Sequence, residues 1–68
     1  MRVTISVNAQ EKTVSSDCTV QTLLDQLGFA QKRVAVEINQ ELVTKNEWQR
    51  VTLHEGDKVE IVSFVGGG

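Results

Sequence analysis

The stretch Thr19-Val20-Gln21-Thr22-Leu23-Leu24-Asp25-Gln26-Leu27-Gly28 decides the fold, because the hydrophobic period of the chain changes there. Its apolar residues fall at i, i+3, i+4 and i+7, which is one stripe of a helix: Val20, Leu23, Leu24 and Leu27. Thr19 suits the N-cap, and Gly28 is placed to end the helix in a left-handed conformation. We therefore expect one helix of about nine residues here.

The segments on both sides of this helix alternate polar and apolar residues with a period of two, which predicts strands. The predicted strands are residues 2–7, 12–16, 34–38, 41–43 and 58–65. Turns are expected at 8–11, at Asn39-Gln40 and at 54–57, where Asn, Gly and Asp gather. Residues 45–48 are expected to form one helical turn that folds Trp48 back over the core.

The order of these elements predicts an α+β fold, because one helix can cover only one face of one sheet. A hairpin, a helix laid across it and then further strands make a β-grasp, with a mixed sheet of four or five strands. The first and last strands are then parallel neighbours at the sheet centre, as the long connection between them allows. We expect residues 1–65 to form this domain and residues 66–68 to form a flexible tail.

Length and composition limit the kinds of protein this can be. The chain has 68 residues, a net charge of −2, one Cys and one His, and is 40% hydrophobic. A domain of this size is marginally stable, and it must rely on an apolar core, because one Cys cannot form an internal disulfide. We expect a cytoplasmic monomer with no membrane segment, and the absence of a basic patch argues against nucleic-acid binding.

No group of side chains predicts catalysis or metal binding within the chain. His54 stands in a turn between charged residues, where a solvated side chain is the simplest interpretation. Cys18 precedes the helix as a small buried or half-exposed thiol, with a role in sulfur transfer as the alternative. One Cys cannot supply the four ligands of the iron–sulfur cluster that some proteins of similar layout carry. We expect no bound cofactor and no catalytic residue.

The last strand predicts a partner-binding face. If Val59 and Ile61 point inward, the other face of the strand carries Glu60, Val62 and Phe64. The same face carries Thr4 and Ser6 from the first strand, and Ala35 and Glu37 from the third. Exposed apolar patches on small domains often bind partners. We expect such a patch at Val62, Phe64 and Ala35, with burial of Phe64 at the domain edge as the alternative.

The glycine run Gly66-Gly67-Gly68 directly follows the last predicted strand. Glycine loses more backbone entropy on ordering than any other residue, so this run does not favour folding. It makes a thin arm with one carboxylate at its tip, which suits threading into the active site of another protein. A frayed terminus or a cloning remnant is the alternative interpretation.

Several stretches together resemble the ThiS family, the sulfur carriers of thiamin biosynthesis within the ubiquitin-like group. These stretches are 19–24 at the helix start, 34–39 in the third strand, Val43 followed by Trp48, Glu55-Gly56-Asp57, and 61–68 at the end. The chain departs from the family pattern at Thr44, where a proline is common, and at Thr22, where an acidic residue is common. Both positions concern local capping.

The resemblance implies a mechanism and a set of partners. An ATP-dependent, ubiquitin-activating-like adenylyltransferase would bind the sheet face through Val62, Phe64, Ala35, Glu60 and Glu37, with Gly66 and Gly67 threading a channel. The Gly68 carboxylate would become an acyl-adenylate and then a thiocarboxylate, with sulfur from cysteine supplied through a desulfurase. Thiazole synthase would take the sulfur. The chain itself would be a carrier and not an enzyme.

Other functions of a glycine-tailed domain stay open at this point. Within the same chemistry, the chain could serve molybdopterin synthesis or another thiolation pathway. A covalent modifier would instead join Gly68 to a lysine of a target protein. A non-covalent docking module would not need its tail, so deletion of Gly67 and Gly68 separates it from the other classes.

Overall fold

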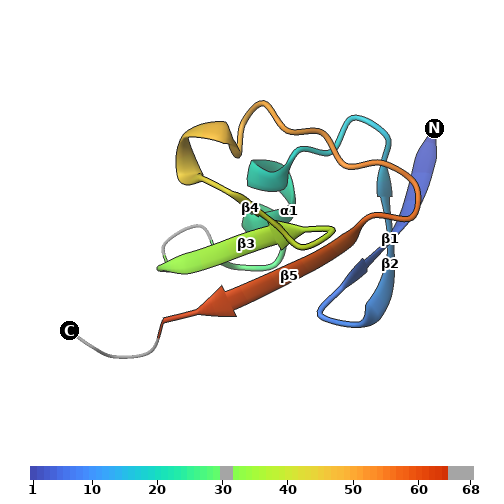
Figure 1. Cartoon of the computed structure of the whole chain (residues 1–68). Helices are drawn as coiled ribbons and strands as arrows, with labels where there is room; N and C mark the ends of the chain where they lie inside the picture. Colours follow the sequence, from blue (N-terminus) through green and yellow to red (C-terminus); the bar gives the residue numbers. More distant parts are fainter. Residues whose placement is uncertain (30–31, 65–68) are drawn as a thin grey trace.

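The computed structural model describes residues 1–29 and 32–64, which form one sheet, one α-helix and one turn of 3-10 helix (Figure 1). The elements in chain order are β1 (Arg2–Val7), β2 (Gln10–Ser15), α1 (Val20–Gln26), β3 (Val34–Ile38), β4 (Glu41–Val43), η1 (Lys45–Glu47) and β5 (Lys58–Ser63). All five predicted strands are present, but β2 ends at Ser15 and β5 ends at Ser63, so Ser16 and Phe64 lie outside the strands predicted to contain them. The expected tail, residues 66–68, and the last predicted strand residue, Val65, lie outside the described residues.

The five strands follow the order β2-β1-β5-β3-β4, so the last strand lies at the centre of the sheet. β1 and β5 are parallel neighbours, while β1–β2, β3–β5 and β3–β4 pair antiparallel. This is the ubiquitin-like β-grasp that the sequence predicts. Because β1 and β5 run in the same direction, the amino end of the chain and the end of β5 lie at opposite ends of the molecule (Figure 1).

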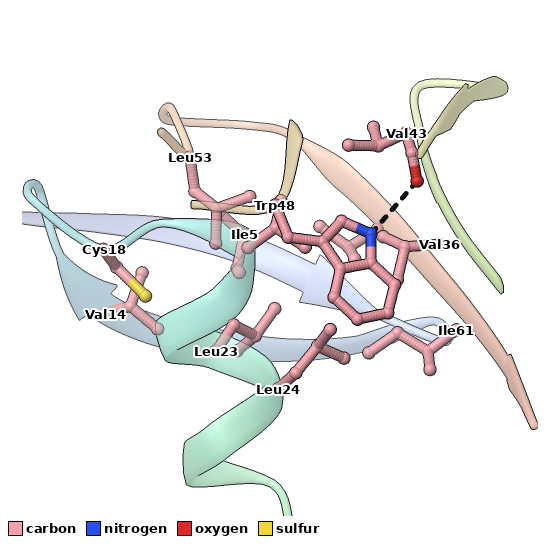
Figure 2. Packing of buried hydrophobic residues seen from close by; sticks show 12 residues of the cluster. Ile5, Val14, Cys18, Leu23, Leu24, Val36, Val43, Trp48, Leu53 and Ile61 are labelled. Carbon is pink, nitrogen blue, oxygen red and sulfur yellow. Dashed lines mark hydrogen bonds between the residues drawn. The ribbon is translucent and has the colours of Figure 1, made fainter. Parts of the chain in front are cut away.

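The core lies between α1 and one face of the sheet (Figure 2). Val20, Leu23 and Leu24 of α1 are completely buried, as the helical stripe predicts. They pack in one cluster with the inward residues of the strands: Ile5, Val14, Val36, Val43, Val59 and Ile61. Trp48 closes this cluster, and its Nε1–H donates a 3.1 Å hydrogen bond to the Val43 carbonyl. A buried indole N–H needs such a partner, so this bond orients the ring.

The ends of α1 follow from its capping residues. The Thr19 hydroxyl accepts a 3.2 Å hydrogen bond from the Thr22 amide, as expected for an N-cap. Gly28 has φ +84°, the left-handed conformation expected after the C-cap. The helix spans 7 residues and ends at Gln26, so it is shorter than predicted, because Leu27 is already the C-cap residue. This helix is too short to cross a membrane, and the described residues contain no longer one.

Two hairpins use two-residue turns with positive φ at both positions. Asn8 and Ala9 have φ 50° and 71°, and Asn39 and Gln40 have φ 52° and 72°. Such turns match the right-handed twist of the strands that they join. The prediction of a four-residue turn at 8–11 is therefore wrong: the turn is two residues long, and β2 starts at Gln10 instead of residue 12.

Candidate functional site

β5 separates its side chains between the two faces of the sheet. Val59 and Ile61 are 1% and 6% exposed, because they point toward α1. Val62 is 58% exposed and Phe64, just after the strand, is 61% exposed. Phe64 therefore does not curl into the domain, and the alternative interpretation of this residue is wrong.

The strand register gathers the predicted face residues. Ala35 of β3 lies opposite Val62 of β5, and Glu37 lies opposite Glu60. In an antiparallel pair, directly opposite residues place their side chains on the same face within contact range. Ala35 is half-buried by its neighbours, while Glu37 and Glu60 are exposed. The apolar pair and the acidic pair thus lie side by side on the face that α1 does not cover.

Leu42 of β4 belongs to the same face, although it was not predicted. It lies opposite Glu37 in the register and is 63% exposed. The signal was present in the sequence, because an inward Val43 requires an outward Leu42. We call the set Ala35, Leu42, Val62 and Phe64, with Glu37 and Glu60, the outer face.

Thr4 and Ser6 of β1 lie half-buried on the far side of β5. The Thr4 amide donates to Oε1 of Glu55 at 2.9 Å, and its carbonyl accepts from the Gly56 amide at 2.8 Å. The turn before β5 therefore satisfies the backbone of Thr4. These contacts hold the β1 side of the sheet to the turn before β5. Apart from Met1, the large exposed apolar residues of the described chain lie on β5 and toward β3 and β4.

The end of β5 is held from both sides. The Asn8 side chain acts as a peptide group would: its Oδ1 accepts from the Ile61 amide at 2.8 Å, and its Nδ2 donates to the Ile61 carbonyl at 3.2 Å. On the opposite side, the Phe64 amide donates to the Arg33 carbonyl at 3.0 Å. The backbone is therefore anchored up to Phe64, and Gly66 follows two residues later.

The remaining candidate groups do not form a reactive site. The His54 side chain is 78% exposed, with its Nδ1 3.9 Å from Oδ2 of Asp57. Cys18 is 3% exposed in the core, and burial raises the pKa of its thiol, an effect that nearby Lys12 partly opposes. A buried, protonated thiol is a poor nucleophile. The residues that the structure describes contain no group of three or more potential metal ligands.

Comparison with known proteins gives the chain a family. The sequence profile of the ThiS family matches residues 4–68, which include the glycine run. The chain belongs to the ThiS family. It is 44% identical over 50 residues to the sulfur carrier protein ThiS of Bacillus subtilis, covering 74% of this chain and 76% of that protein. A crystal structure of the thiamine biosynthesis protein ThiS from Geobacter metallireducens superposes with a TM-score of 0.81 and 35% identity, covering 97% and 100% of the two chains.

A second kind of relative carries the ThiS-like segment inside a longer protein. The thiazole synthase of Paramagnetospirillum magneticum is 45% identical over 62 residues, which is 91% of this chain. The chain spans only 19% of the length of that protein. A segment similar to this ThiS-family domain therefore occurs in one polypeptide with a thiazole synthase.

Proposed function

We propose that this protein is a sulfur carrier whose C-terminal carboxylate, at Gly68, is converted to a thiocarboxylate for thiazole formation in thiamin biosynthesis. Membership of the ThiS family across residues 4–68 carries this proposal. The carrier is a co-substrate and not an enzyme, and ATP is bound by its activating partner. We place the reaction in the cytoplasm, where ATP is available.

The chemistry needs two steps at the carboxyl group of Gly68. A Gly68 carboxylate oxygen attacks the α-phosphate of ATP, and pyrophosphate leaves. Sulfide-level sulfur, derived from cysteine through a desulfurase and released from the resulting persulfide by a thiol reductant, then attacks the acyl carbon. AMP leaves, and the thiocarboxylate remains. Activation is required because a carboxylate is a poor electrophile until one oxygen becomes part of a good leaving group. Glycine at the tip favours the second attack, because no β-carbon crowds the acyl carbon.

The outer face supplies the contact with the ubiquitin-activating-like adenylyltransferase. Val62 and Phe64 are large, exposed and adjacent to the start of the tail. Burying them against a partner removes apolar area from water, which is the main driving force of most protein association. Glu37 and Glu60 border this apolar centre and favour partners that present basic groups. Gly66 and Gly67 allow a narrow channel to contact the tail backbone.

Thiazole synthase is the proposed acceptor of the sulfur. The support comes from the relatives named thiazole synthase that contain a segment similar to this chain. Joining two partners in one polypeptide raises their effective concentration, so it is favoured when they act together.

The test is the intact mass of the protein after incubation with the adenylyltransferase, ATP and a sulfide source. We expect a shift equal to the replacement of one oxygen by sulfur. The variant without Gly67 and Gly68 should keep its fold and show no shift. A shift that survives the deletion, or no shift with a competent enzyme, would contradict the proposal. A lysine-linked adduct would indicate a covalent modifier instead.

A further inference from the structure

A groove lined partly by basic residues lies beside Phe64, where the start of β3 and the end of β4 meet η1. Its volume is about 530 Å³. Three apolar residues of the outer face, Ala35, Leu42 and Phe64, form part of its wall. Three basic residues also line this groove: Lys32, Arg33 and Lys45. We call this the basic groove.

The charge of the basic groove contrasts with that of the chain. The protein has a net charge of −2, yet three of its seven basic residues line this one groove. In the described part of the chain no carboxylate forms an ion pair with any of the three, and the nearby Glu47 carboxylate accepts hydrogen bonds from Thr44 instead. Glu37 and Glu60 lie farther along the same strands. The surface therefore presents a basic end near Phe64 and an acidic end away from it.

The groove also offers an open backbone edge at Val34. In an antiparallel pair, alternate residues bond to the same neighbouring strand. The Phe64 amide donates to the Arg33 carbonyl, so Arg33 bonds toward β5 and Val34 faces the β4 side. β4 ends at Val43, which pairs with Val36, so the ladder stops before Val34. No strand in the described part of the chain pairs with this side of Val34, and an extended segment could do so.

We propose that the basic groove binds an acidic segment of the activating enzyme, in which one or two carboxylates flank an apolar side chain. The carboxylates complement Lys32, Arg33 and Lys45, and the apolar side chain packs on Phe64 and Leu42. This inference rests on the proposed function. The activating enzyme is the occupant because it must aim the tail at ATP, and a contact beside Phe64 fixes the direction in which the tail leaves the domain.

The test measures ATP–pyrophosphate exchange with the purified adenylyltransferase of the source organism. The variants are Arg33→Glu and Lys45→Glu, both at exposed positions. The matched control is Arg2→Glu, which changes the net charge equally but lies at the start of β1, at the opposite end of the molecule (Figure 1). Thermal melting of all three variants shows whether the fold is kept.

We expect each groove variant to lower kcat/KM for the carrier roughly tenfold, because both binding and the aim of the tail depend on the groove. The Arg2→Glu control should keep the kcat/KM of the unchanged protein within about twofold. The difference between groove variants and control should shrink at about 1 M salt, where screening extends only ~3 Å.

Other results overturn the inference in distinguishable ways. Exchange with the unchanged protein, together with groove variants that match the Arg2→Glu control, refutes the groove and leaves the proposed function standing. Unaltered exchange but weaker binding to thiazole synthase assigns the groove to the other partner. Concentration-dependent dimers that Arg33→Glu abolishes assign it to a second copy of the chain. No exchange even with the unchanged protein removes the proposed function, and the groove inference with it.

Discussion

Both faces of the sheet carry apolar side chains, but those on one face are buried in the core and those on the other are exposed. On the inner face, Val59 and Ile61 are buried against α1 and hold the domain together. On the outer face, Val62 and Phe64 of the same segment contact mostly water. Alternate residues of one segment thus have different tasks: the inward residues stabilise the fold and, in our proposal, the outward residues bind a partner. Substitutions one residue apart should therefore have unrelated consequences.

The largest contrast is expected between Ile61→Asp and Val62→Asp. A carboxylate at Ile61 would be buried without a partner, which costs more than a small domain can lose, so we expect an unfolded protein. Val62→Asp should change the free energy of unfolding by no more than about 0.5 kcal/mol, yet weaken binding to the adenylyltransferase. Urea denaturation and a binding titration measure the two effects. A large stability loss for Val62→Asp would show that this side chain belongs to the core.

Substitutions of Asn8 test how much its side-chain hydrogen bonds to β5 contribute to stability. Asn8→Ala removes two hydrogen bonds to Ile61 and places alanine at φ 50°, so we expect a loss of about 2–3 kcal/mol. Asn8→Gly is the matched variant, because it removes the same bonds but tolerates the positive φ. It should lose about 1–2 kcal/mol in chemical denaturation. Equal losses for the two variants would mean that the backbone conformation contributes nothing.

Adjacent residues of β4 give a finer comparison. Val43 is 9% exposed and Leu42 is 63% exposed. Val43→Ala should cost about 1.5–2.5 kcal/mol, whereas Leu42→Ala removes more carbon and should cost at most about 0.5 kcal/mol. Thermal and urea denaturation of the pair check this. If Leu42→Ala proved the more costly change, the outer face would be contributing to stability after all.

The smallest expected effect concerns Cys18. Burial raises the pKa of its thiol above the ordinary value of 9.0, so the unfolded state loses this proton first as pH rises. The thiol therefore has no influence on the pH dependence below about pH 9, and it destabilises the fold as pH rises from there through the folded-state pKa. Urea denaturation of the protein and of Cys18→Ala from pH 7 to 10 should show a steeper decline for the former. Equal slopes would contradict a raised pKa.

Thiol labelling gives a second check on Cys18. With 3% of the residue exposed, a thiol reagent should modify the folded protein far more slowly than the urea-unfolded one. Labelling at equal rates would show that the thiol is accessible, and would reopen its role in sulfur transfer.

The architecture was predictable because the apolar residues follow two clear periods, one typical of a helix and one typical of strands. The helical spacing of Val20, Leu23, Leu24 and Leu27 and the alternation in the strands are local, and each has one physical solution. The inward set Val59 and Ile61 followed from that alternation, and so did the outward positions of Val62 and Phe64. Because the sequence contains only one predicted helix, it was possible to predict which residues lie on the sheet face that the helix leaves uncovered.

The features that escaped prediction depend on contacts or on very short elements. Leu42 was missed although an inward Val43 implies it, because alternation over a three-residue strand is a weak signal. The bonds of Asn8 join residues 53 positions apart, which no local pattern reveals. Ala9 at φ 71° is an unusual choice for a residue with a β-carbon, so the two-residue turn was not expected. Lys32, Arg33 and Lys45 come from two separate stretches of the sequence, so the basic groove that they line was not predicted.

The central place of β5 has a mechanical consequence. A partner that draws the tail into a channel pulls along β5, which lies between β1 and β3. Tension in this direction loads the five residue pairs with β3 and the two with β1 together. It cannot break them one by one, as it could for a strand at the edge of the sheet. Resistance to pulling is set by the unfolding rate, not by the equilibrium stability. A small, marginally stable domain can thus stay folded while a partner pulls on its tail.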